Sequence, residues 1–491
     1  MIELTGANFI GFGKSSKGTN KIFGINPIDN SRLPQEFSEA DLEEIHTTVE
    51  LAEKAFKNYR KKSDQIRANF IREIANEIEN LGDQLIQTAC KETALPEARI
   101  TGERGRTTGQ LRLFASFIED GKYRNIISEK AEPERQPLPK PSLMMDQIPL
   151  GPVVIFGASN FPLAFSVAGG DTAAALAAGC PVIFKAHPSH PNTSELVAHA
   201  IQQAALKTDM PNGVFSLLHG ASHYVGESLV KAPGVKAVAF TGSFRGGKAI
   251  YDLAVRRDEP IPVYAEMGSI NPVFLLPKRI EKLGKSLAEG LSQSVCLGVG
   301  QFCTNPGLII LHRKNIDLLE MMAEELDKQS LGTFLNSGIA NAFSKGVNAL
   351  AENADVKKWT KNTLPSPSLF SINAEDLRNN KQVLEEVFGP STLAIIADHQ
   401  SDMMDLIDLL PGQLTATLQA EKEDIEKNRE LIESISYKVG RVILNAFPTG
   451  VEVSHAMVHG GPYPATTDPR TTSVGTQALY RFTRPICWQG F

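Results

Sequence analysis

Four short runs rich in β-branched and aromatic residues alternate with segments of helical composition in the middle of the chain. Strand, helix, strand in this rhythm predicts right-handed βαβ units and a parallel sheet. The expected strands are 153–156, 182–185, 214–218 and 235–240, and the expected helices are 161–178, 191–207, 223–231 and 245–256. Because ligands of such sheets bind beyond the carboxyl ends of the strands, we expect the chemistry in the loops after Phe156, Lys185, Leu218 and Phe240.

The segment before these strands has a different pattern. Apolar residues repeat at helical spacing over 42–56, after a candidate N-cap at Ser38, and over 66–78, after Ser63. This part is therefore expected to be mainly helical. A charged, proline-rich stretch from about 120 to 150 then predicts an extended arm.

Composition limits the class of protein. The 491 residues carry 50 Lys and Arg against 56 Asp and Glu, a formal charge of −6, and 42% of them are hydrophobic. These values are typical of a globular protein of two or three domains and argue against a nucleic-acid binder or a disordered chain. The most apolar long stretch, 151–184, is interrupted by Asn160 and Asp171, so no membrane span is predicted. Residues 1–4 lack the pattern of a secretory signal, so export is not expected.

The five cysteines are odd in number and widely spaced, with no CxxC pair. This pattern argues against a disulfide framework or a thiolate zinc site. It favours free thiols in a reducing cytoplasm, where one of them could act as a nucleophile. His187 and His190 are not accompanied by further ligands, so no metal is expected.

The loop after the last of the four strands is rich in glycine. Gly242-Ser-Phe-Arg-Gly-Gly-Lys-Ala nearly matches a P-loop, but Ala249 stands where a Ser or Thr hydroxyl would hold magnesium. The GxGxxG dinucleotide fingerprint is absent. The glycines and Ser243 at a helix start could still hold a phosphate through backbone N–H groups. A plain turn and helix cap is the alternative.

A thiol and a carboxylate are the candidate reactive groups. Cys303, in Gly300-Gln-Phe-Cys-Thr, lies beside small and polar residues where a substrate could approach. A lone cysteine is more often a buried apolar residue, and Cys296 is a competing candidate. Glu266 ends the apolar run Val263-Tyr-Ala-Glu, where burial would raise its pKa toward the range of a general base, although a solvated Glu is commoner at a strand end.

Six separated motifs, taken in order, resemble those of the aldehyde dehydrogenase superfamily over nearly the whole chain. They are Asn160-Phe-Pro, Lys185, Phe240-Thr-Gly-Ser, Glu266-Met-Gly, Gly300-Gln-Phe-Cys and Glu386-Val-Phe-Gly-Pro. The C-terminal runs that begin at Asn445, His459 and Arg484 are similar to one branch of it. That branch contains the 2-oxoglutarate semialdehyde (2,5-dioxopentanoate) dehydrogenases and a bacterial NADP-linked fatty aldehyde dehydrogenase.

The resemblance implies an α/β fold with three parts. These are a parallel-sheet, Rossmann-type NAD(P)-binding domain from residues 1–124 and 151–266, an α/β catalytic domain over 267–450, and a small β oligomerisation arm from 125–150 and 465–491. The implied protein is a homodimer or homotetramer that acts on a small-molecule aldehyde and binds neither nucleic acid nor membrane.

The resemblance also implies a role for each motif residue. Cys303 would attack the aldehyde, and Asn160 with the Cys303 N–H would hold the oxyanion of the thiohemiacetal. Glu266 would activate water to hydrolyse the resulting thioester. Glu386 and Phe388 match positions at the nicotinamide ribose. The full set implied in cofactor binding is Lys185, His187, Gly220, Thr241, Gly242, Ser243, Glu386 and Phe388.

Cofactor choice is predicted from one departure from the family pattern. Many NAD-preferring members carry a glutamate three positions after the lysine, and here that position is Pro188. Without this carboxylate a 2′-phosphate would meet no repulsion, and Lys185 and His187 could attract it. We therefore predict that NADP is preferred over NAD, with use of both left open.

The substrate is predicted from arginines in a helical segment. Arg104, Arg106 and Arg112 lie in the region that lines the aldehyde tunnel in the family. One of them could clamp the distal carboxylate of 2-oxoglutarate semialdehyde, whereas a solvated helix face is the alternative. His459 is a further candidate, either near the nicotinamide or as an auxiliary base. Fatty or other aliphatic aldehydes are an alternative substrate class, and a cofactor-free Cys303–His459 hydrolase is an alternative of a different class.

Overall fold

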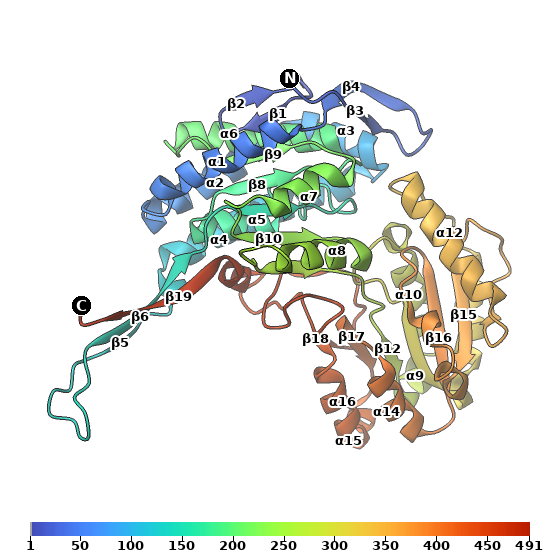
Figure 1. Ribbon diagram of the computed structural model, residues 1–491. Coiled ribbons are helices and arrows are strands. Elements are labelled where there is room, and N and C mark those ends of the chain that lie inside the picture. The colour runs from blue at the N-terminus through green and yellow to red at the C-terminus, as the bar shows by residue number, and fades with distance from the viewer. Residues whose placement is uncertain (1) are drawn as a thin grey trace.

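Two α/β lobes and a projecting arm make up the computed structural model, which describes residues 2–491 (Figure 1). Met1, the first residue of the N-terminal segment considered above, lies outside the described residues. Within residues 2–491, no helix combines the length and the apolar character needed to cross a bilayer.

The first lobe is built on a seven-stranded sheet that contains the predicted parallel strands. Its order is β11-β10-β7-β8-β9-β1-β2, with β7 to β11 parallel and with β1 and β2 antiparallel at one edge. The strands are β1 (Asn8–Ile10), β2 (Gly13–Ser15), β7 (Val153–Phe156), β8 (Val182–Lys185), β9 (Phe215–Leu218), β10 (Ala237–Thr241) and β11 (Val263–Glu266). Their connecting helices are α5 (Gly170–Ala178), α6 (Pro191–Lys207), α7 (His223–Lys231) and α8 (Phe244–Val255), so the predicted βαβ rhythm is confirmed.

The helix expected over 161–178 begins late, at Gly170. The residues before it form a loop, because the backbone N–H groups of Leu163 and Ala164 donate to the buried carboxylate of Glu103 at 2.8 and 2.9 Å. A tertiary contact thus replaces the hydrogen bonds that a longer helix would make.

Four helices precede the parallel strands, as the apolar periodicity predicts: α1 (Leu42–Tyr59), α2 (Asp64–Asn80), α3 (Gly82–Thr93) and α4 (Glu97–Glu119). Ser63 caps α2 as expected, but the N-cap of α1 is Asp41, which forms a capping box with Glu44. Ser38 instead ends β4 (Arg32–Ser38), which pairs with β3 (Lys21–Ile25) in a hairpin.

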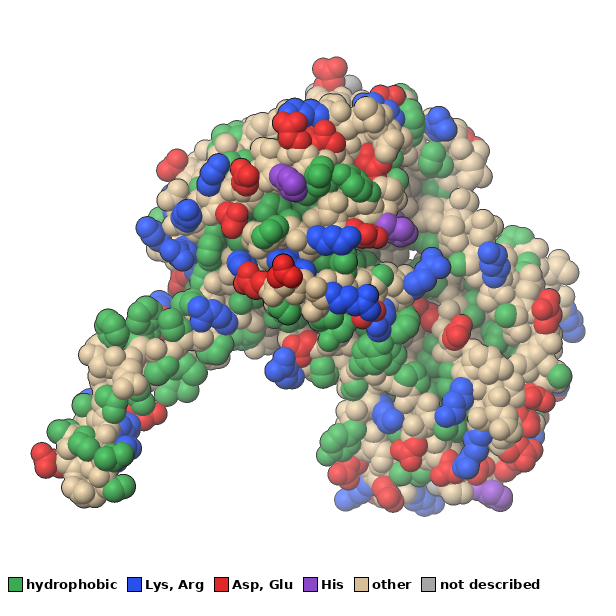
Figure 2. All heavy atoms as spheres, viewed as in Figure 1, with side chains coloured by type: hydrophobic (Ala, Val, Ile, Leu, Met, Phe, Trp, Pro, Cys, Tyr) green, Lys and Arg blue, Asp and Glu red, His purple; other side chains and the backbone are tan. Residues whose placement is uncertain are grey.

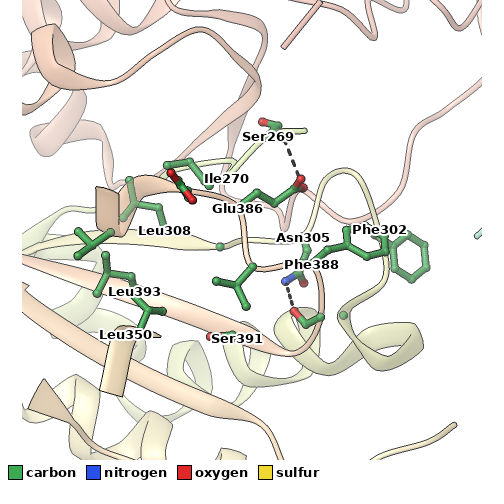
Figure 3. Close-up of a pocket in the computed structure, with 16 residues that line it drawn as sticks. Ser269, Ile270, Phe302, Asn305, Leu308, Leu350, Glu386, Phe388, Ser391 and Leu393 are labelled. Carbon is green, nitrogen blue, oxygen red and sulfur yellow. Dashed lines mark hydrogen bonds between the residues drawn. The ribbon is translucent and has the colours of Figure 1, made fainter. Parts of the chain in front are cut away.

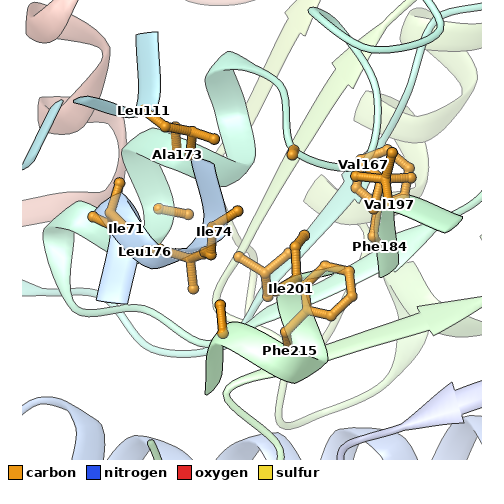
Figure 4. Close-up of a cluster of buried hydrophobic side chains, with 14 of the residues drawn as sticks. Ile71, Ile74, Leu111, Val167, Ala173, Leu176, Phe184, Val197, Ile201 and Phe215 are labelled. Atoms are coloured by element: carbon orange, nitrogen blue, oxygen red, sulfur yellow. The ribbon is translucent and has the colours of Figure 1, made fainter. Parts of the chain in front are cut away.

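The largest apolar core lies between these helices and the first sheet (Figure 4). Ile71 and Ile74 of α2 and Leu111 of α4 surround Leu176 of α5, and all four side chains are fully buried. Because α5 consists mostly of small residues, α2 and α4 can approach it closely. This packing fixes α4, which carries the arginines of the predicted substrate site.

The second lobe has its own seven-stranded sheet, in the order β14-β15-β16-β13-β12-β17-β18. All neighbouring pairs are parallel except β14 with β15. The strands are β12 (Val273–Leu275), β13 (Leu308–His312), β14 (Lys357–Lys358), β15 (Ser368–Asn373), β16 (Ser391–Ala397), β17 (Gln413–Gln419) and β18 (Val439–Leu444). The helices are α9 (Pro277–Leu283), α10 (Lys285–Cys296), α11 (Asp317–Asp327), α12 (Ser337–Glu352), α13 (Ala374–Leu377), α14 (Gln400–Leu409), α15 (Lys422–Lys427) and α16 (Arg429–Ser436). The predicted α/β class is thus confirmed in both lobes.

The arm is a three-stranded antiparallel sheet of β5 (Ile127–Glu129), β6 (Leu143–Pro149) and β19 (Thr483–Gln489), and it projects from the first lobe (Figures 1 and 2). The sequence places the C-terminal part of the arm from residue 465, but strand pairing begins only at Thr483. The residues before it return to the first lobe, where Ala478 and Leu479 of the 3-10 helix η5 (Thr476–Phe482) are buried in the core with α5.

The loops in which the sequence predicts the functional residues meet at a crevice between the lobes. The carboxyl ends of β8 to β11 face the second lobe (Figure 1), and the surface is hollowed there (Figure 2). The segment after the 3-10 helix η2 (Leu297–Gly300) and the irregular segment after β18 meet these loops.

Candidate active site

Three side chains from distant parts of the chain meet at this crevice. Glu266 ends β11, Cys303 follows η2, and His459 lies in the irregular segment after β18. One atom of each, Cys303 Sγ, His459 Nε2 and a Glu266 carboxylate oxygen, lies within 4.8 Å of the other two. The predicted nucleophile and base are therefore neighbours, and His459 contacts both.

Two hydrogen bonds hold the two oxygens of the Glu266 carboxylate. His459 Nε2 lies 2.9 Å from Glu266 Oε1 and 3.5 Å from Cys303 Sγ. Ser473 Oγ donates to Glu266 Oε2 at 2.5 Å. Glu266, His459 and Ser473 are 3%, 1% and 5% exposed, so water does not compete for these contacts. No sequence pattern marks Ser473, because its place depends on how the C-terminal segment returns to β11.

The resting Cys303 is a protonated thiol. Burial raises its pKa well above the ordinary value of a cysteine, and the negative charges of Glu266 and Glu386 raise it further. The charge of Arg441 acts in the opposite direction and is outweighed. Such a thiol becomes a nucleophile only when a neighbouring base takes its proton.

The charge state of Glu266 differs from the sequence prediction. Burial pushes its pKa up, as expected. The charge and hydrogen bond of His459, the hydrogen bond of Ser473 and the charge of Arg481 together lower the pKa below the ordinary value. The predicted rise is therefore wrong, since a buried carboxylate with such partners stays ionised. Glu266 is thus a carboxylate at neutral pH, ready to accept a proton.

Asn160 lies in the loop between β7 and α5, with one amide hydrogen engaged. Its Nδ2 donates to the backbone oxygen of Gln301 at 3.0 Å, which ties this loop to the segment that carries Cys303. The second amide hydrogen stays available for another acceptor. Glu103 of α4 holds the same loop through the N–H groups described above. Glu103 lies three residues before Arg106 on one helix face, a spacing that is visible in the sequence.

A cavity of about 440 Å³ opens beside Cys303. Its wall is partly aromatic and partly charged. The residues that line it are Arg99, Arg106, Phe161, Phe165, Phe302, Cys303, Thr304, Gly450, Val451 and Glu452.

Two guanidinium groups of α4 face this cavity. Arg106 Nη1 donates to the backbone oxygen of Val451, while its Nε is buried without a partner. Arg99 Nη1 donates to Glu103 at 3.0 Å, and its guanidinium lies 4.4 Å from the centre of the Phe161 ring. Guanidinium groups at the wall of a cavity suit an anionic ligand.

Arg104 and Arg112 do not reach the cavity, so the prediction that they line it is wrong. Arg104 Nη1 donates to the backbone oxygen of Gly82 at 3.3 Å, and Arg112 pairs with Glu79 through two bonds of 2.6 and 2.8 Å. Side chains two residues apart on a helix point about 200° apart, so Arg104 and Arg106 cannot share a face. Arg99, about two turns before Arg106, does share its face and was missed.

The residues predicted to bind the cofactor from the first lobe lie after its parallel strands. Lys185 ends β8 and His187 follows it, Gly220 follows β9, Thr241 ends β10, and Gly242 and Ser243 lie between β10 and α8. Ser243 is the N-cap of α8, and its Oγ accepts from Gly246 N at 3.3 Å. Because Gly242 and Ser243 are exposed, the first N–H groups of α8 can receive a phosphate of a dinucleotide.

Burial controls the charge of the basic groups in this part of the crevice. Burial lowers the pKa of Lys185 to about 8, against the charge of Glu39, which raises it. Burial also holds the pKa of His187 well below its ordinary value, and the charges of His190 and Lys185 add to this. His187 is therefore neutral at pH 7 and does not supply the positive charge that the sequence suggested.

An acidic residue that the sequence did not indicate lies beside these groups. Glu39 follows β4 and is 6% exposed. Its carboxylate accepts from Ser222 N at 3.0 Å, from Ser222 Oγ at 2.5 Å and from Asn20 Nδ2 at 3.1 Å. Glu39 Oε1 would lie 3.3 Å from a Cβ placed on Gly220, which fixes the carboxylate against the loop after β9.

Glu386 and Phe388 lie on the second-lobe side of the crevice (Figure 3). Glu386 Oε1 accepts from Ser269 N at 3.4 Å, and Oε2 packs so closely on Gly268 that any side chain there would collide with it. Glu386 is open to the crevice, yet desolvation by the surrounding protein raises its pKa to about 7, against the Ser269 hydrogen bond. Together with the loops of the first lobe, this arrangement fits a bound NAD(P).

Comparison with known proteins gives a match over nearly the whole chain. Residues 14–483 match the model of the Aldehyde dehydrogenase family. Alpha-ketoglutaric semialdehyde dehydrogenase 2 of Azospirillum brasilense is 46% identical over 500 residues, covering 100% of this chain and 95% of the relative. Alpha-ketoglutaric semialdehyde dehydrogenase of Acinetobacter baylyi is 43% identical over 498 residues, covering 100% of this chain and 94% of the relative.

Solved structures share the fold at lower sequence identity. A 1-pyrroline-5-carboxylate dehydrogenase from Thermus with bound NAD has a TM-score of 0.82 at 20% identity, covering 98% of this chain and 92% of the other. An aldehyde dehydrogenase from Bacillus cereus in complex with NAD+ has a TM-score of 0.82 at 21% identity, covering 98% of this chain and 96% of the other. The match to the family model and the identity with the two relatives show that the chain belongs to the aldehyde dehydrogenase family.

Proposed function

We propose that the protein oxidises 2-oxoglutarate semialdehyde to 2-oxoglutarate, with NADP as the preferred cofactor and NAD as a second one. The observation that carries the reaction type is the contact of His459 Nε2 with both Cys303 Sγ, at 3.5 Å, and Glu266 Oε1, at 2.9 Å. The two relatives named for alpha-ketoglutaric semialdehyde, which is the same compound, support the substrate.

In the first half of the proposed reaction, Cys303 adds to the aldehyde carbon. Its proton passes to the Glu266–His459 pair, and the thiolate forms the carbon–sulfur bond. The free amide hydrogen of Asn160 and the Cys303 N–H hold the oxyanion. Bound NAD(P) supplies the acceptor for the hydride that leaves this carbon. The enzyme then carries a thioester at Cys303.

In the second half, Glu266 takes a proton from the water molecule that attacks the thioester carbon. His459 and Ser473 keep its two oxygens oriented, as they do before the reaction starts. Cys303 leaves as a thiolate and is protonated again. Each turnover yields one carboxylate, one reduced cofactor and two protons.

Arg106 is the proposed partner of the distal carboxylate of the substrate. Its side chain lines the cavity that also contains Cys303, and Arg99 adds a second positive charge on the same helix face. A fatty or other aliphatic aldehyde is the second candidate substrate. It is favoured by the three phenylalanine rings in the wall of the same cavity.

Lys185 supports the preference for NADP. It ends β8, in a loop where Pro188 replaces the carboxylate of NAD-preferring members. The ammonium group can attract a 2′-phosphate, whereas Glu39 cancels part of this attraction and leaves the site usable by NAD.

Assembly through the arm and a cytoplasmic location complete the proposal. Ile127, Leu138, Met144 and Trp488 are exposed on the arm, and a homodimer or homotetramer would cover such side chains. All five cysteines are free thiols, which suits a reducing compartment.

A panel of aldehydes tested with NADP checks this proposal. We expect the highest kcat/KM for 2-oxoglutarate semialdehyde, a lower value for succinate semialdehyde, and the lowest for long-chain aldehydes, measured by absorbance of the reduced nicotinamide. A higher value for long-chain aldehydes would favour the second candidate. Formation of acid without reduced cofactor would favour the Cys303–His459 hydrolase instead.

A further inference from the structure

A sulfur, a nitrogen and an oxygen converge at the reaction centre in a set that also suits a metal ion. We propose that Cys303 Sγ, His459 Nε2 and a Glu266 oxygen form a binding site for Zn²⁺ and similar thiophilic divalent cations, such as Co²⁺. Occupation of this site inhibits the enzyme reversibly. The cation has no part in the catalytic cycle, for which no metal is expected.

The spacing of the three atoms is close to that of a tetrahedral zinc site. Bond lengths of about 2.3 Å for Zn–S and about 2.0–2.1 Å for Zn–N place the two ligand atoms about 3.6 Å apart in such a site. Cys303 Sγ and His459 Nε2 are 3.5 Å apart. His459 Nε2 and Glu266 Oε1 are 2.9 Å apart, against about 3.4 Å in an ideal site. No pair exceeds 4.8 Å, so small side-chain movements complete the geometry.

Burial and charge around the cluster favour a cation. Glu266 and His459 are at most 3% exposed, Ser473 donates to the Glu266 carboxylate, and the backbone N–H of His459 donates to Thr472 Oγ1, so two of the three ligands are ordered before binding. Glu266 and Glu386 place negative charge at the sulfur, which offsets the positive charges of Arg106 and Arg441 nearby. Cys303 itself is partly exposed in the wall of the aldehyde cavity, where water can be the fourth ligand.

Two protons change place when the cation binds. The Cys303 thiol proton is released to solvent as the metal–sulfur bond forms. His459 Nε2 donates to Glu266 in the resting site, so this nitrogen must lose its proton when the metal binds, and the neutral ring then carries its proton at Nδ1. Nδ1 is buried without a protein partner. His459, Asp468 and Arg481 are among the residues that line a small cavity, and a water molecule there can accept the hydrogen bond.

The bound cation would stop catalysis in two ways. It occupies the lone pairs of the sulfur that attacks the aldehyde, and it prevents Glu266 from accepting a proton. This consequence rests on the proposed roles of Cys303 and Glu266, whereas the binding itself does not.

Cobalt spectroscopy tests the binding directly, because a cobalt–thiolate bond adds a charge-transfer band in the near ultraviolet. Co²⁺ titrated into the full-length protein without added thiols is expected to give this band, saturating at one ion per chain, and Zn²⁺ should remove it. Cys303→Ser should abolish the band, and His459→Gln should weaken binding at least about tenfold. Circular dichroism shows whether each variant is folded. Cys296→Ser is the matched control, since this thiol lies on α10 outside the cluster, and it should keep the band.

Three results would overturn the proposal: no thiolate band in the unsubstituted protein, a band that persists in Cys303→Ser, or undiminished binding in folded His459→Gln. The activity readout is inhibition by Zn²⁺ that a chelator reverses, and inhibition that persists after chelation would contradict the reversible site. Because the cobalt spectrum needs neither aldehyde nor dinucleotide, its outcome is independent of whether the proposed substrate is correct.

Discussion

At the scale of single residues, Arg106 is the side chain that we propose distinguishes a charged from an uncharged aldehyde. Arg106→Ala is expected to raise KM for 2-oxoglutarate semialdehyde roughly 10- to 100-fold, because a charge-assisted hydrogen bond contributes about 1.5–3 kcal/mol. The kcat/KM for pentanal, which has no distal carboxylate, should change little. Arg104→Ala is the control, since that side chain bonds to Gly82 on another face of α4. Equal effects of the two substitutions would exclude Arg106 as the specific partner.

A second residue, Glu39, is proposed to set the charge near the adenosine end of the cofactor. Glu39→Gln is expected to raise the ratio of kcat/KM for NADP to that for NAD at least about threefold, because a negative charge beside Lys185 is removed. The amide keeps an acceptor for Ser222. Glu36→Gln, an exposed change on β4 three residues before Glu39, should leave the ratio unchanged. A shift toward NAD in Glu39→Gln would contradict the proposed role.

The sequence indicated the proposed reacting residues more completely than the side chains that surround them. Cys303, Glu266 and His459 each stood out by motif or residue type, and the fold brings them into contact. Ser473 and Glu39 could not be found in this way, because each acts through a contact with a segment far away in the chain. The predicted direction of the Glu266 pKa shift was wrong for the same reason. The sequence indicates that Glu266 is buried, but it does not reveal the side chains that lower its pKa.

At the scale of elements, helix α4 positions the loop that carries Asn160. Glu103→Gln is expected to lower the free energy of unfolding by about 1–3 kcal/mol, because one of the buried partners Leu163 N, Ala164 N and Arg99 loses its acceptor. It should also lower kcat, since the oxyanion donor shifts. Urea denaturation and steady-state kinetics measure the two effects. Glu97→Gln, an exposed change in the first turn of α4, is the control, and an unchanged kcat in Glu103→Gln would contradict the positioning role.

The bounds of an element agree with the sequence prediction where local sequence patterns determine them. They differ where a tertiary contact determines them. The expected range of α6 agrees with the structure, where Pro191 occupies its first turn and apolar residues follow at helical spacing. The start of α5 was placed too early because the helical composition of 161–169 cannot reveal the Glu103 carboxylate that holds Leu163 and Ala164 in a loop.

At the scale of the whole molecule, the arm is the surface that we expect to join subunits. Trp488 and Met144 are cross-strand neighbours on β19 and β6, and both are exposed. Trp488→Asp should therefore lower the assembly state measured by sedimentation velocity, since a charge cannot be buried in an apolar contact at low cost. Tyr437→Asp, on a highly exposed aromatic residue of the second lobe, should not change it. An unaltered assembly state in Trp488→Asp would exclude this face of the arm from the interface.

The change in hydrophobic periodicity along the sequence predicts the order of the two lobes. It does not predict the path of the C-terminal segment. Residues between β18 and β19 return to the first lobe and bring His459 and Ser473 to Glu266. Only the folded chain reveals this return, because the segment lacks regular periodicity and its partners lie on β11 and α5.

The most direct test of the proposed chemistry is a single turnover of Glu266→Gln with 2-oxoglutarate semialdehyde and NADP. Loss of the base should slow thioester hydrolysis by about 10²- to 10⁴-fold, while Cys303 can still react because His459 remains to take its proton. We expect a burst of one reduced cofactor per chain and, by mass spectrometry after acid quenching, one 2-oxoglutaryl group on Cys303. An acyl group on another residue, or acid released without any reduced cofactor, would contradict the assignment.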